Sequence, residues 1–290
     1  MWINVIDYRG DEGTPLYEKR TNNLMKMQMD FSRWQEHGHQ FRCFTQHKIN
    51  DTDFVNYDDV IEIERGNASY ARNTVLDFYK KDEWIGVWDN DATLYWEKLK
   101  SAVFPGELDN ICENNRLHCF LPIWSGFMPY SAAIQMTIKS TYSKNGFSFT
   151  PSPRIKGTMF FTKVCDIRFD VNTRYGEDVE FGIRLTLDNK LCGFINEVSL
   201  NEYGGLSTTT AKDDDARKNS TIAAFEYLEK TYGSFKELQN KQRGLWTDPF
   251  KLADEYMAEA LIAKEYEKMK SEERKTKRLM KNNQLFDFNG

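Results

Sequence analysis

Histidine and cysteine are scarce in this sequence, and neither is spaced as a metal site. The chain has four histidines and five cysteines in 290 residues. No Cys-x-x-Cys pair occurs, the number of cysteines is odd, and they are spread over positions 43, 112, 119, 165 and 192. These features argue against a zinc finger or a disulfide scaffold and favour a reducing compartment.

Long apolar runs are also missing. The first residues, MWINVIDYRGDEG, have neither the basic start nor the apolar stretch of a secretory leader. No window approaches the roughly 20 apolar residues that span a bilayer. We therefore expect a cytoplasmic protein that does not bind membranes.

An excess of positive charge is absent as well. The net charge is −5, so no global basic field attracts a nucleic acid, and any such binding must come from a local patch. Aromatic residues, by contrast, make up 14% of the chain. They suffice for a core and leave rings for stacking on a ligand. The length allows one large domain with an appendage, or two small domains.

The first 90 residues alternate between strand-like and helix-like patterns. Strands are expected at 2–8, 41–46, 60–63 and 84–88, and helices from Thr14-Pro15 to about 37–39 and over about 69–81. The nearly continuous apolar run at 84–88, WIGVW, is typical of a strand that is buried on both faces. This alternation indicates an open α/β sheet, in which ligands bind beyond the carboxyl ends of the strands.

The second half is more mixed and ends in a basic tail. A strand-like segment at 156–164 precedes helix-like segments at about 179–187 and 217–231. Asp248-Pro249 is a favourable helix start, and the helix that it opens is predicted to reach about Lys281. We expect a main domain over 1–245 and a basic helical extension over 246–290.

Four basic residues of this extension share one face at helical spacing: Lys270, Arg274, Lys277 and Lys281. Such a face can follow the phosphates of a nucleic acid. The alternative is a solvated, charged terminus that binds nothing.

Asp89-Asn90-Asp91 directly follows the predicted buried strand. Two carboxylates one residue apart, on a loop that leaves a strand end, can both approach one divalent cation. Oxygen ligands suit Mn²⁺ or Mg²⁺, which also accept phosphate oxygens. A metal that bridges a diphosphate stabilises it as a leaving group. The alternative for an acidic triplet is a solvated turn.

Gly176-Glu177-Asp178 stands directly before a predicted helix. The helix macrodipole favours carboxylates at this position, and that alone explains them. The same placement also holds a carboxylate at a cleft, where it can accept a proton from an acceptor hydroxyl.

Tyr8-Arg9 ends the first predicted strand. An aromatic ring and a guanidinium there can stack on a base and contact a phosphate. The alternative is a surface loop with an exposed arginine.

Taken in order, these segments resemble GT-A glycosyltransferases, including the β-1,4-galactosyltransferase-like group. The resemblance spans about residues 2–200. It rests first on an Arg-containing loop after the first strand and on a helix with Asn and Arg before the strand that leads to the metal ligands. Later in the chain it rests on a strand that contains a glycine, on an apolar residue followed by Asp, and on the triplet GED. The matching segments here are DYR, GNASYARNTVLDFYKKDEWIGVWDND, IKGTMFFTK, IRFD and YGEDVEFGIRL.

The resemblance implies a GT-A-like open, mostly parallel sheet flanked by helices, with a helical C-terminal extension. It implies that Asp89 and Asp91 hold the metal and the donor diphosphate. Asp178 would be the base on the acceptor hydroxyl, and Glu177 would contact the acceptor. Three further residues would lie near the nucleotide-sugar: Asn67, Arg72 and Asn73. Many relatives add a late His as a third metal ligand, but no His follows His118 here, so the rest of the metal shell stays open.

A second resemblance concerns the segment GGLSTTT, followed by Arg217, Asn219 and AAFEYLEKTYG. It is similar to the ending of the TET-associated and phage DNA glycosyltransferases, and the composition suits a T-even-like phage. This implies transfer of a sugar, such as glucose or the pentose arabinose, from a UDP-sugar to 5-hydroxymethylcytosine in DNA, in the host cytoplasm. Two alternatives remain: a glycosyltransferase acting on a glycan or small-molecule hydroxyl, and a non-catalytic DNA-binding protein.

Overall fold

The computed structural model describes residues 1–48, 53–90, 92–94, 104–113, 117–124, 149–155, 157–173, 176–202 and 214–247. Residues 1–243 form one compact unit, and residues 244–290 form a second. The predicted boundary at 245/246 stays a prediction, because little of the second unit is described.

Four parallel strands form the N-terminal part of the sheet, in the order β3-β2-β1-β4. They are β1 (Trp2–Asp7), β2 (Gln40–Thr45), β3 (Asp59–Glu62) and β4 (Trp84–Asp89). Each lies where the sequence predicts a strand, and β4 is buried from Ile85 to Trp88. Because β1 and β4 are parallel neighbours, Tyr8 and Asn90 leave the sheet at the same edge.

The remaining strands extend this sheet in mixed directions. They are β5 (Ala92–Leu94), β6 (Leu117–Trp124), β7 (Phe149–Pro151), β8 (Met159–Lys163) and β9 (Leu191–Glu202). The strand β8 pairs antiparallel with β4 and β6, while β6 and β9 are parallel. Both β5 and β7 pair antiparallel with β9, which completes a nine-stranded sheet.

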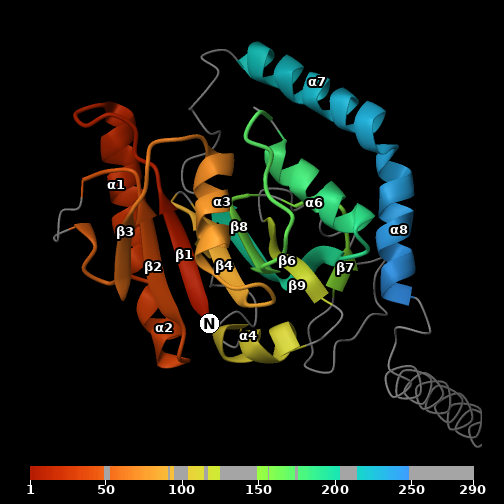
Figure 1. Cartoon of the computed structure of the whole chain (residues 1–290). Coiled ribbons are helices and arrows are strands. Elements are labelled where there is room, and N and C mark those ends of the chain that lie inside the picture. The colour runs from red at the N-terminus through yellow and green to blue at the C-terminus, as the bar shows by residue number, and fades with distance from the viewer. Residues whose placement is uncertain are drawn as a thin grey trace, which may run out of the picture. The chain divides into compact units, whose positions relative to one another are not determined.

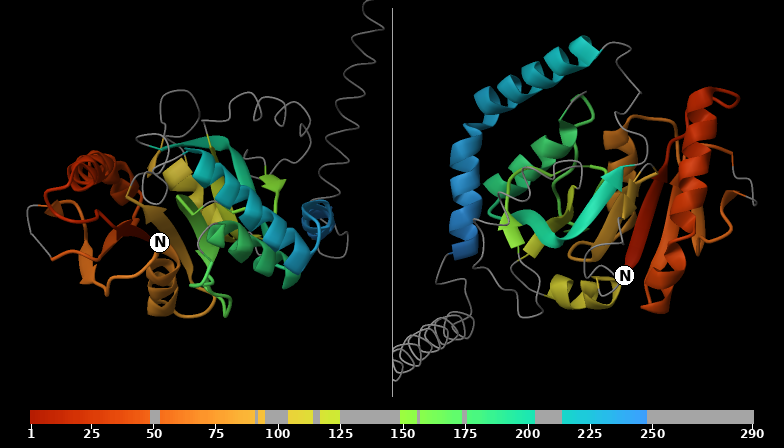
Figure 2. Two further views of the ribbon diagram at one scale, coloured as in Figure 1. Left: turned by 90° about the horizontal axis from the view of Figure 1, so that it is seen from above. Right: turned by 180° about the vertical axis from the view of Figure 1, so that it is seen from behind.

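Helices cover both faces of the sheet (Figures 1 and 2). One face carries α3 (Ala68–Phe78) and α6 (Glu177–Leu187), and the other carries α1 (Pro15–Gln28) and α2 (Phe31–Glu36). On the first face, Val87 of β4 belongs to a buried cluster with Val75 of α3 and Phe181 of α6. On the second, the Trp88 and Trp34 rings lie 5.2 Å apart between centroids. The predicted class, an open α/β sheet flanked by helices, is confirmed. The sheet was expected to be mostly parallel, but four of its eight described pairings are antiparallel.

The helix predicted to run without a break from Thr14 to about residue 37 is in fact two helices. Its start is as predicted: Thr14 caps α1 through a bond from the Tyr17 N–H (3.2 Å), and Pro15 follows. The break falls at residues 29–30, and Asp30 stands at the N-cap position of α2 without a side-chain cap bond. The last residue of α1, Gln28, donates to the Asp53 carbonyl (2.6 Å) and thereby fixes the break.

Further helices are α4 (Phe104–Glu113), α7 (Asp214–Tyr232) and α8 (Phe235–Thr247). The Tyr232 hydroxyl of α7 donates to the buried Glu180 of α6. From α8, the amide of Gln242 donates to the Thr186 hydroxyl of α6 (2.9 Å). The sequence patterns predicted α7 but not α8. Within the described part of the chain, no helix is long and apolar enough to cross a membrane.

All five cysteines are free and buried. Burial raises the pKa of the Cys43, Cys165 and Cys192 thiols above the ordinary value. These three thiols are therefore uncharged core groups at neutral pH.

Candidate active site

The acidic triplet begins where β4 reaches the edge of the sheet. Asp89, the last residue of β4, is fixed by a bond from its backbone N–H to the Thr158 carbonyl (2.9 Å). Its side chain is 29% exposed, so the carboxylate borders solvent although the strand is buried. Asp91, the second predicted metal ligand, lies outside the described residues.

Arg72 of α3 joins two of the predicted site carboxylates. Its guanidinium contacts the Asp89 carboxylate at 2.8 Å and the Glu177 carboxylate at 3.0 Å, and its side chain is 5% exposed. Burial works to lower the pKa of Arg72, but Asp89, Glu177 and Asp178 outweigh it and raise the pKa. The guanidinium is therefore a permanent cation between the end of β4 and the start of α6.

Glu177 and Asp178 are the first residues of α6. The N-cap is Gly176, whose φ of 75° favours glycine because other residues are strained there. The Asp178 carboxylate accepts bonds from the backbone N–H groups of Gly157 and Val179, both at 2.8 Å, and is thereby held in one orientation. Burial raises the pKa of Glu177, while the neighbouring Arg72 acts to lower it.

Gly157 is the fifth residue of this group and contacts both Arg72 and Asp178. A Cβ atom at Gly157 would lie 2.2 Å from the Arg72 guanidinium, so the glycine allows the backbone to reach both Arg72 and Asp178. We refer to Arg72, Asp89, Gly157, Glu177 and Asp178 as the Arg72 cluster. It joins residues from α3, β4, α6 and the turn before β8.

Asn67 and Asn73, which the resemblance places near the nucleotide-sugar, hold the backbone around the cluster. Asn73 donates to the Phe169 carbonyl (2.9 Å) and accepts from the Phe169 N–H (2.8 Å). Asn67 caps α3 through the Tyr70 N–H (2.9 Å) and donates to the Val171 carbonyl (2.8 Å). Both amides thus fasten the segment before α6 to α3. A direct contact with a donor stays a prediction.

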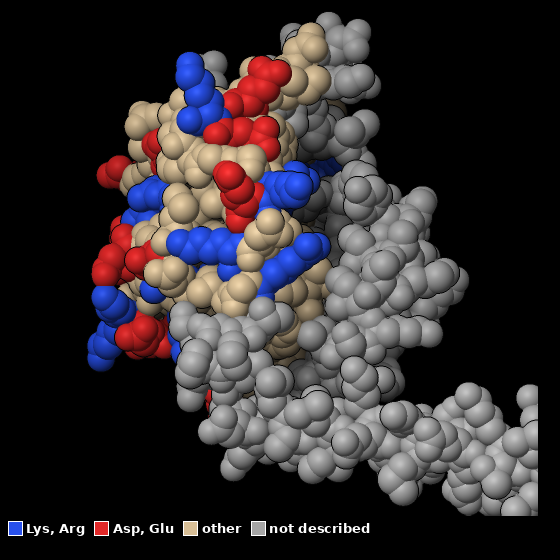
Figure 3. Space-filling view, turned by 90° about the vertical axis from the view of Figure 1, so that its right-hand side faces the viewer, with Lys and Arg blue, Asp and Glu red and all other residues tan. Residues whose placement is uncertain are grey.

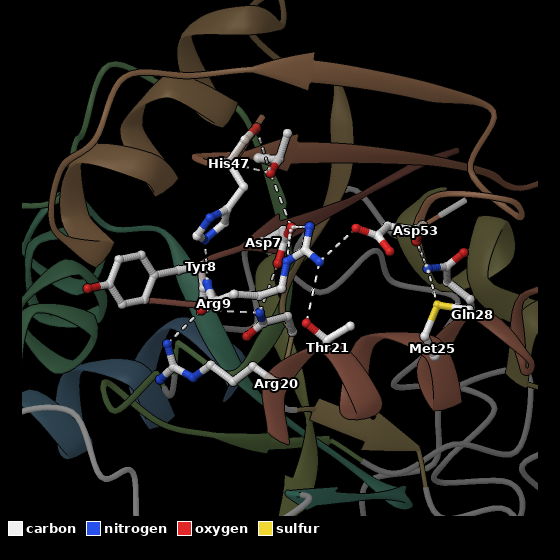
Figure 4. A network of polar contacts seen from close by, with 11 residues as sticks. Asp7, Tyr8, Arg9, Arg20, Thr21, Met25, Gln28, His47 and Asp53 are labelled. Carbon is white, nitrogen blue, oxygen red and sulfur yellow. Dashed lines mark hydrogen bonds and ion pairs between the residues drawn. The ribbon is translucent and has the colours of Figure 1, made fainter. Parts of the chain in front are cut away.

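Tyr8 and Arg9 point in different directions from the end of β1 (Figure 4). Tyr8 is 43% exposed. The Arg9 guanidinium is buried and contacts the carboxylates of Asp7 and Asp53, both at 3.0 Å. Its backbone N–H donates to His47 Nε2 (2.9 Å). A contact between Arg9 and a donor phosphate would require these ion pairs to open, whereas the Tyr8 ring is accessible.

The Arg72 cluster carries an excess of negative charge. It contains three carboxylates and one guanidinium, so its net charge is −2 when all are ionised. Within the described ranges, no group of three or more His, Cys, Asp or Glu side chains is arranged to hold a metal ion. The predicted nucleic-acid contacts Lys270, Arg274, Lys277 and Lys281 lie outside those ranges.

Two residues around the site, Gly157 and Asp7, are not singled out by the sequence analysis. Gly157 stands in a strand-like segment, and only the fold reveals that it touches Arg72. Asp7 was expected only as part of a loop motif, yet it is a fully buried carboxylate that pairs with Arg9. The sequence signal that could have found Asp7 is a charged residue at the end of a strand that is apolar except for Asn4.

Comparison with known proteins adds little to the geometry. No protein-family model matches the chain, and no curated protein matches it. A solved structure with a detectable similarity is that of GalNAc-T7 with UDP, GalNAc and Mn²⁺, at 11% sequence identity and a TM-score of 0.40. The alignment covers 90% of this chain and 57% of the GalNAc-T7 chain. At this level the similarity carries nothing about what the present chain binds.

Proposed function

We propose that the protein is a metal-dependent glycosyltransferase of the GT-A type that uses a UDP-sugar. One observation carries the proposal: the Arg72 cluster brings the end of β4 and the start of α6 together at the carboxyl edge of the parallel strands. Ligands of open α/β sheets bind at this edge. A donor site and a proton acceptor are both needed there, and the cluster offers carboxylates for each.

The charge of the cluster fits a divalent cation. The cluster has a net charge of −2, and its Asp89 carboxylate is partly exposed, which suits Mn²⁺ or Mg²⁺. Asp89 with Asp91 would hold the ion. When bound, such an ion supplies charge neutralisation for the diphosphate as it leaves. Arg72 would keep the Asp89 carboxylate aimed at the edge of the sheet.

Asp178 is the proposed base on the acceptor hydroxyl. Two backbone N–H groups orient its carboxylate, so the group can meet a hydroxyl without first losing side-chain freedom. Glu177, one residue earlier, is the proposed contact to the acceptor. For the donor base we propose stacking on Tyr8, whose accessible ring leaves the sheet beside Asn90.

The proposed acceptor is 5-hydroxymethylcytosine in DNA. This finer assignment rests on the sequence similarity around residues 204–233 and on the basic tail. A base inside a duplex must be flipped out before its hydroxymethyl group can reach Asp178, at a cost of a few kcal/mol. A glycan or small-molecule hydroxyl is the alternative acceptor.

The test is a donor screen read by mass spectrometry, with Mn²⁺ present and hydroxymethylated DNA as the acceptor. Unmodified DNA of the same sequence is the control. A mass gain of one sugar on the hydroxymethylated DNA alone, abolished by excess chelator, supports the whole proposal. Nucleotide-sugar hydrolysis without DNA modification keeps the enzyme class and redirects the acceptor to another hydroxyl. Neither hydrolysis nor transfer with any donor would overturn the proposed function.

A further inference from the structure

The middle residue of the acidic triplet is buried and bonded to the neighbouring strand. Asn90 is 4% exposed. Its side-chain Nδ2 donates to the Asp7 carboxylate (3.1 Å) and to the Tyr8 carbonyl (3.2 Å). Asn90 therefore ties the residues after β4 to the end of β1 through a side chain, in addition to the pairing of the strands.

The anchor that Asn90 uses is itself fixed. The Asp7 carboxylate is fully buried and accepts Asn90 through Oδ1, while Oδ2 accepts the Arg9 Nε (3.0 Å) and the Thr45 hydroxyl (3.1 Å). Arg9 continues the network to Asp53 (3.0 Å), as Figure 4 shows. A buried carboxylate with this many partners has one favourable position, because any movement would leave a charge unpaired.

The same amide also holds Tyr8. The Tyr8 carbonyl accepts Asn90 and, at 2.6 Å, the Arg20 guanidinium. The Arg20 guanidinium carbon lies 5.2 Å from the centre of the Tyr8 ring, so the half-exposed ring is held against a cation. The backbone that carries the ring is therefore fixed from two sides.

We propose that Asn90 is a positioning residue that sets the distance between the Tyr8 ring and the Asp89 carboxylate. This inference rests on the proposed function, in which Tyr8 receives the donor base and Asp89 the metal side of the diphosphate. The base and the diphosphate of one donor are covalently joined, so the two subsites must keep a fixed separation. Asn90 bonds to the end of β1, which carries Tyr8, and directly follows Asp89. Asn90 therefore links the two subsites.

The role predicts different results for two substitutions. Asn90→Ala removes both side-chain bonds to the end of β1 and leaves only the pairing of β1 with β4. Asn90→Asp places a second carboxylate against that of Asp7, and the like charges push the loop further away. If Asn90 were instead a ligand to the metal, the added carboxylate of Asn90→Asp would preserve or strengthen metal binding. The two variants thus separate positioning from direct ligation.

Asn4 provides a matched control between the same two strands. It is a fully buried amide of β1, its Nδ2 donates to the Gly86 carbonyl of β4 (3.0 Å), and its Oδ1 accepts the Tyr79 hydroxyl (2.6 Å). Asn4→Ala removes a comparable pair of buried bonds near the middle of the strands. It should lower the melting temperature by a similar amount and leave the subsites in place.

The experiment measures UDP binding in the presence of Mn²⁺ by calorimetry, and amide hydrogen exchange without ligand, on the full-length protein and its variants. Losing two hydrogen bonds should weaken UDP binding by about tenfold in Asn90→Ala, and further in Asn90→Asp. Amide exchange should rise together around residues 8–10 and 89–90 in these two variants. Asn4→Ala should bind UDP as the unsubstituted protein does.

The outcomes that would overturn the inference are distinct from those that overturn the proposed function. If the unsubstituted protein binds UDP and Asn90→Ala binds it equally well, Asn90 is a structural residue only. Tighter Mn²⁺ binding by Asn90→Asp would also overturn positioning. If the unsubstituted protein binds no UDP with Mn²⁺, the proposed function fails, and the role of Asn90 in donor binding fails with it.

Discussion

The Arg72 guanidinium is buried between Asp89 and Glu177. It therefore determines how a substitution at either carboxylate affects the geometry and stability of the site. A neutral amide at Asp89 or Glu177 still accepts a hydrogen bond from Arg72, so asparagine and glutamine variants keep the geometry while removing charge. An alanine at either position would leave the buried cation with one partner, which costs several kcal/mol. Amide substitutions are therefore the informative ones at this site.

The first prediction concerns the metal. Asp89→Asn combined with Asp91→Asn should abolish turnover while the protein stays folded, because the carboxylates for the cation are lost but the bond to Arg72 remains possible. Turnover of each donor and circular dichroism spectra provide the measurement, with excess chelator on the unsubstituted protein as the parallel test. Full activity of the folded double variant, or activity that resists the chelator, contradicts the assignment.

The second prediction concerns the base. Asp178→Asn should lower kcat by about two to four orders of magnitude, the range for loss of general-base assistance. The asparagine oxygen can still accept the Gly157 N–H, so the turn before β8 should keep its place. The donor KM should change little. A variant with a normal kcat and weak donor binding would make Asp178 a donor-site residue.

The third prediction uses His118 of β6, which does not belong to the Arg72 cluster. Burial, with smaller effects of Lys190 and Lys163, lowers the pKa of His118 from the ordinary 6.5 to about 3. Between these values the unfolded chain binds a proton that the folded chain does not. The free energy of unfolding should therefore fall as the pH falls below about 6.5, by up to about 1.4 kcal/mol per pH unit from this residue.

Urea unfolding at pH 7 and pH 5 measures that slope. His118→Gln removes the titrating group, so the loss of stability between the two pH values should be smaller in the variant. Equal losses in both proteins would mean that His118 is protonated or solvated in the folded state.

At the scale of elements, the position of α6 depends on a glycine that touches the neighbouring backbone. A Cβ atom at Gly182 would lie 2.3 Å from the Pro153 carbonyl oxygen and 2.8 Å from the Ile155 side chain. A backbone carbonyl cannot rotate away as a side chain can, so the helix itself must shift. Gly182 follows Asp178 by one helical turn, and the shift therefore reaches the proposed base.

Gly182→Ala should consequently destabilise the fold by about 1–3 kcal/mol and lower turnover. Gly244→Ala is the matched control, because Gly244 also stands in a helix and a Cβ atom there meets nothing within 4 Å. That change should stabilise the protein slightly, by up to about 1 kcal/mol. Thermal unfolding and turnover of both variants provide the comparison. A stable, active Gly182→Ala protein would show that α6 can move without consequence.

The elements that the sequence predicts are those with strong local patterns. The apolar run of β4, the β-branched run of β1 and the Thr14-Pro15 helix start are each readable within a few residues. The break between α1 and α2 is not, because the bond from Gln28 to the Asp53 carbonyl comes from residues 25 apart. The pairing of β6 with β9 joins still more distant segments and has no local signature.

The same distinction holds within the site. Asp89, Glu177 and Asp178 could be picked out because each stands beside a recognisable strand end or helix start. Their meeting could not, since Arg72 and Glu177 are 105 residues apart and only the folded sheet brings them together. The burial of Arg9 was likewise unpredictable, because its partner Asp53 comes from a separate loop.

At the scale of the whole molecule, the described surface on the side of α7 and α8 is not one basic face. Figure 3 shows acidic and basic side chains interspersed among the coloured residues on the side that carries α7 and α8. Exposed residues of both signs occur along these helices: Glu226, Glu229, Lys230, Lys236, Glu237 and Arg243. Strong phosphate binding, if the acceptor is DNA, should therefore depend on the basic tail.

The fifth prediction tests this dependence by truncation after Tyr266. If four or so tail residues contact phosphates, the log–log dependence of DNA affinity on salt should have a slope of about −3 to −4 in the full chain. The truncated chain should show a shallower slope and weaker transfer to hydroxymethylated DNA. Donor hydrolysis in the absence of DNA serves as the control and should be unchanged. An identical salt slope in both chains would assign DNA binding to other residues.

The burial of all five cysteines makes thiol chemistry a reporter of opening in this protein. A thiol reagent such as a maleimide reacts with the thiolate form of cysteine. In the folded protein, burial keeps the reagent away from the thiols, and the raised pKa values of Cys43, Cys165 and Cys192 disfavour the thiolate. Each modification event therefore records a local or global exposure of a particular part of the fold. Cys43 belongs to β2, Cys119 to β6 and Cys192 to β9, so peptide mapping after timed labelling can rank these strands by how often they open. The native sequence already carries the probes, and no cysteine needs to be introduced.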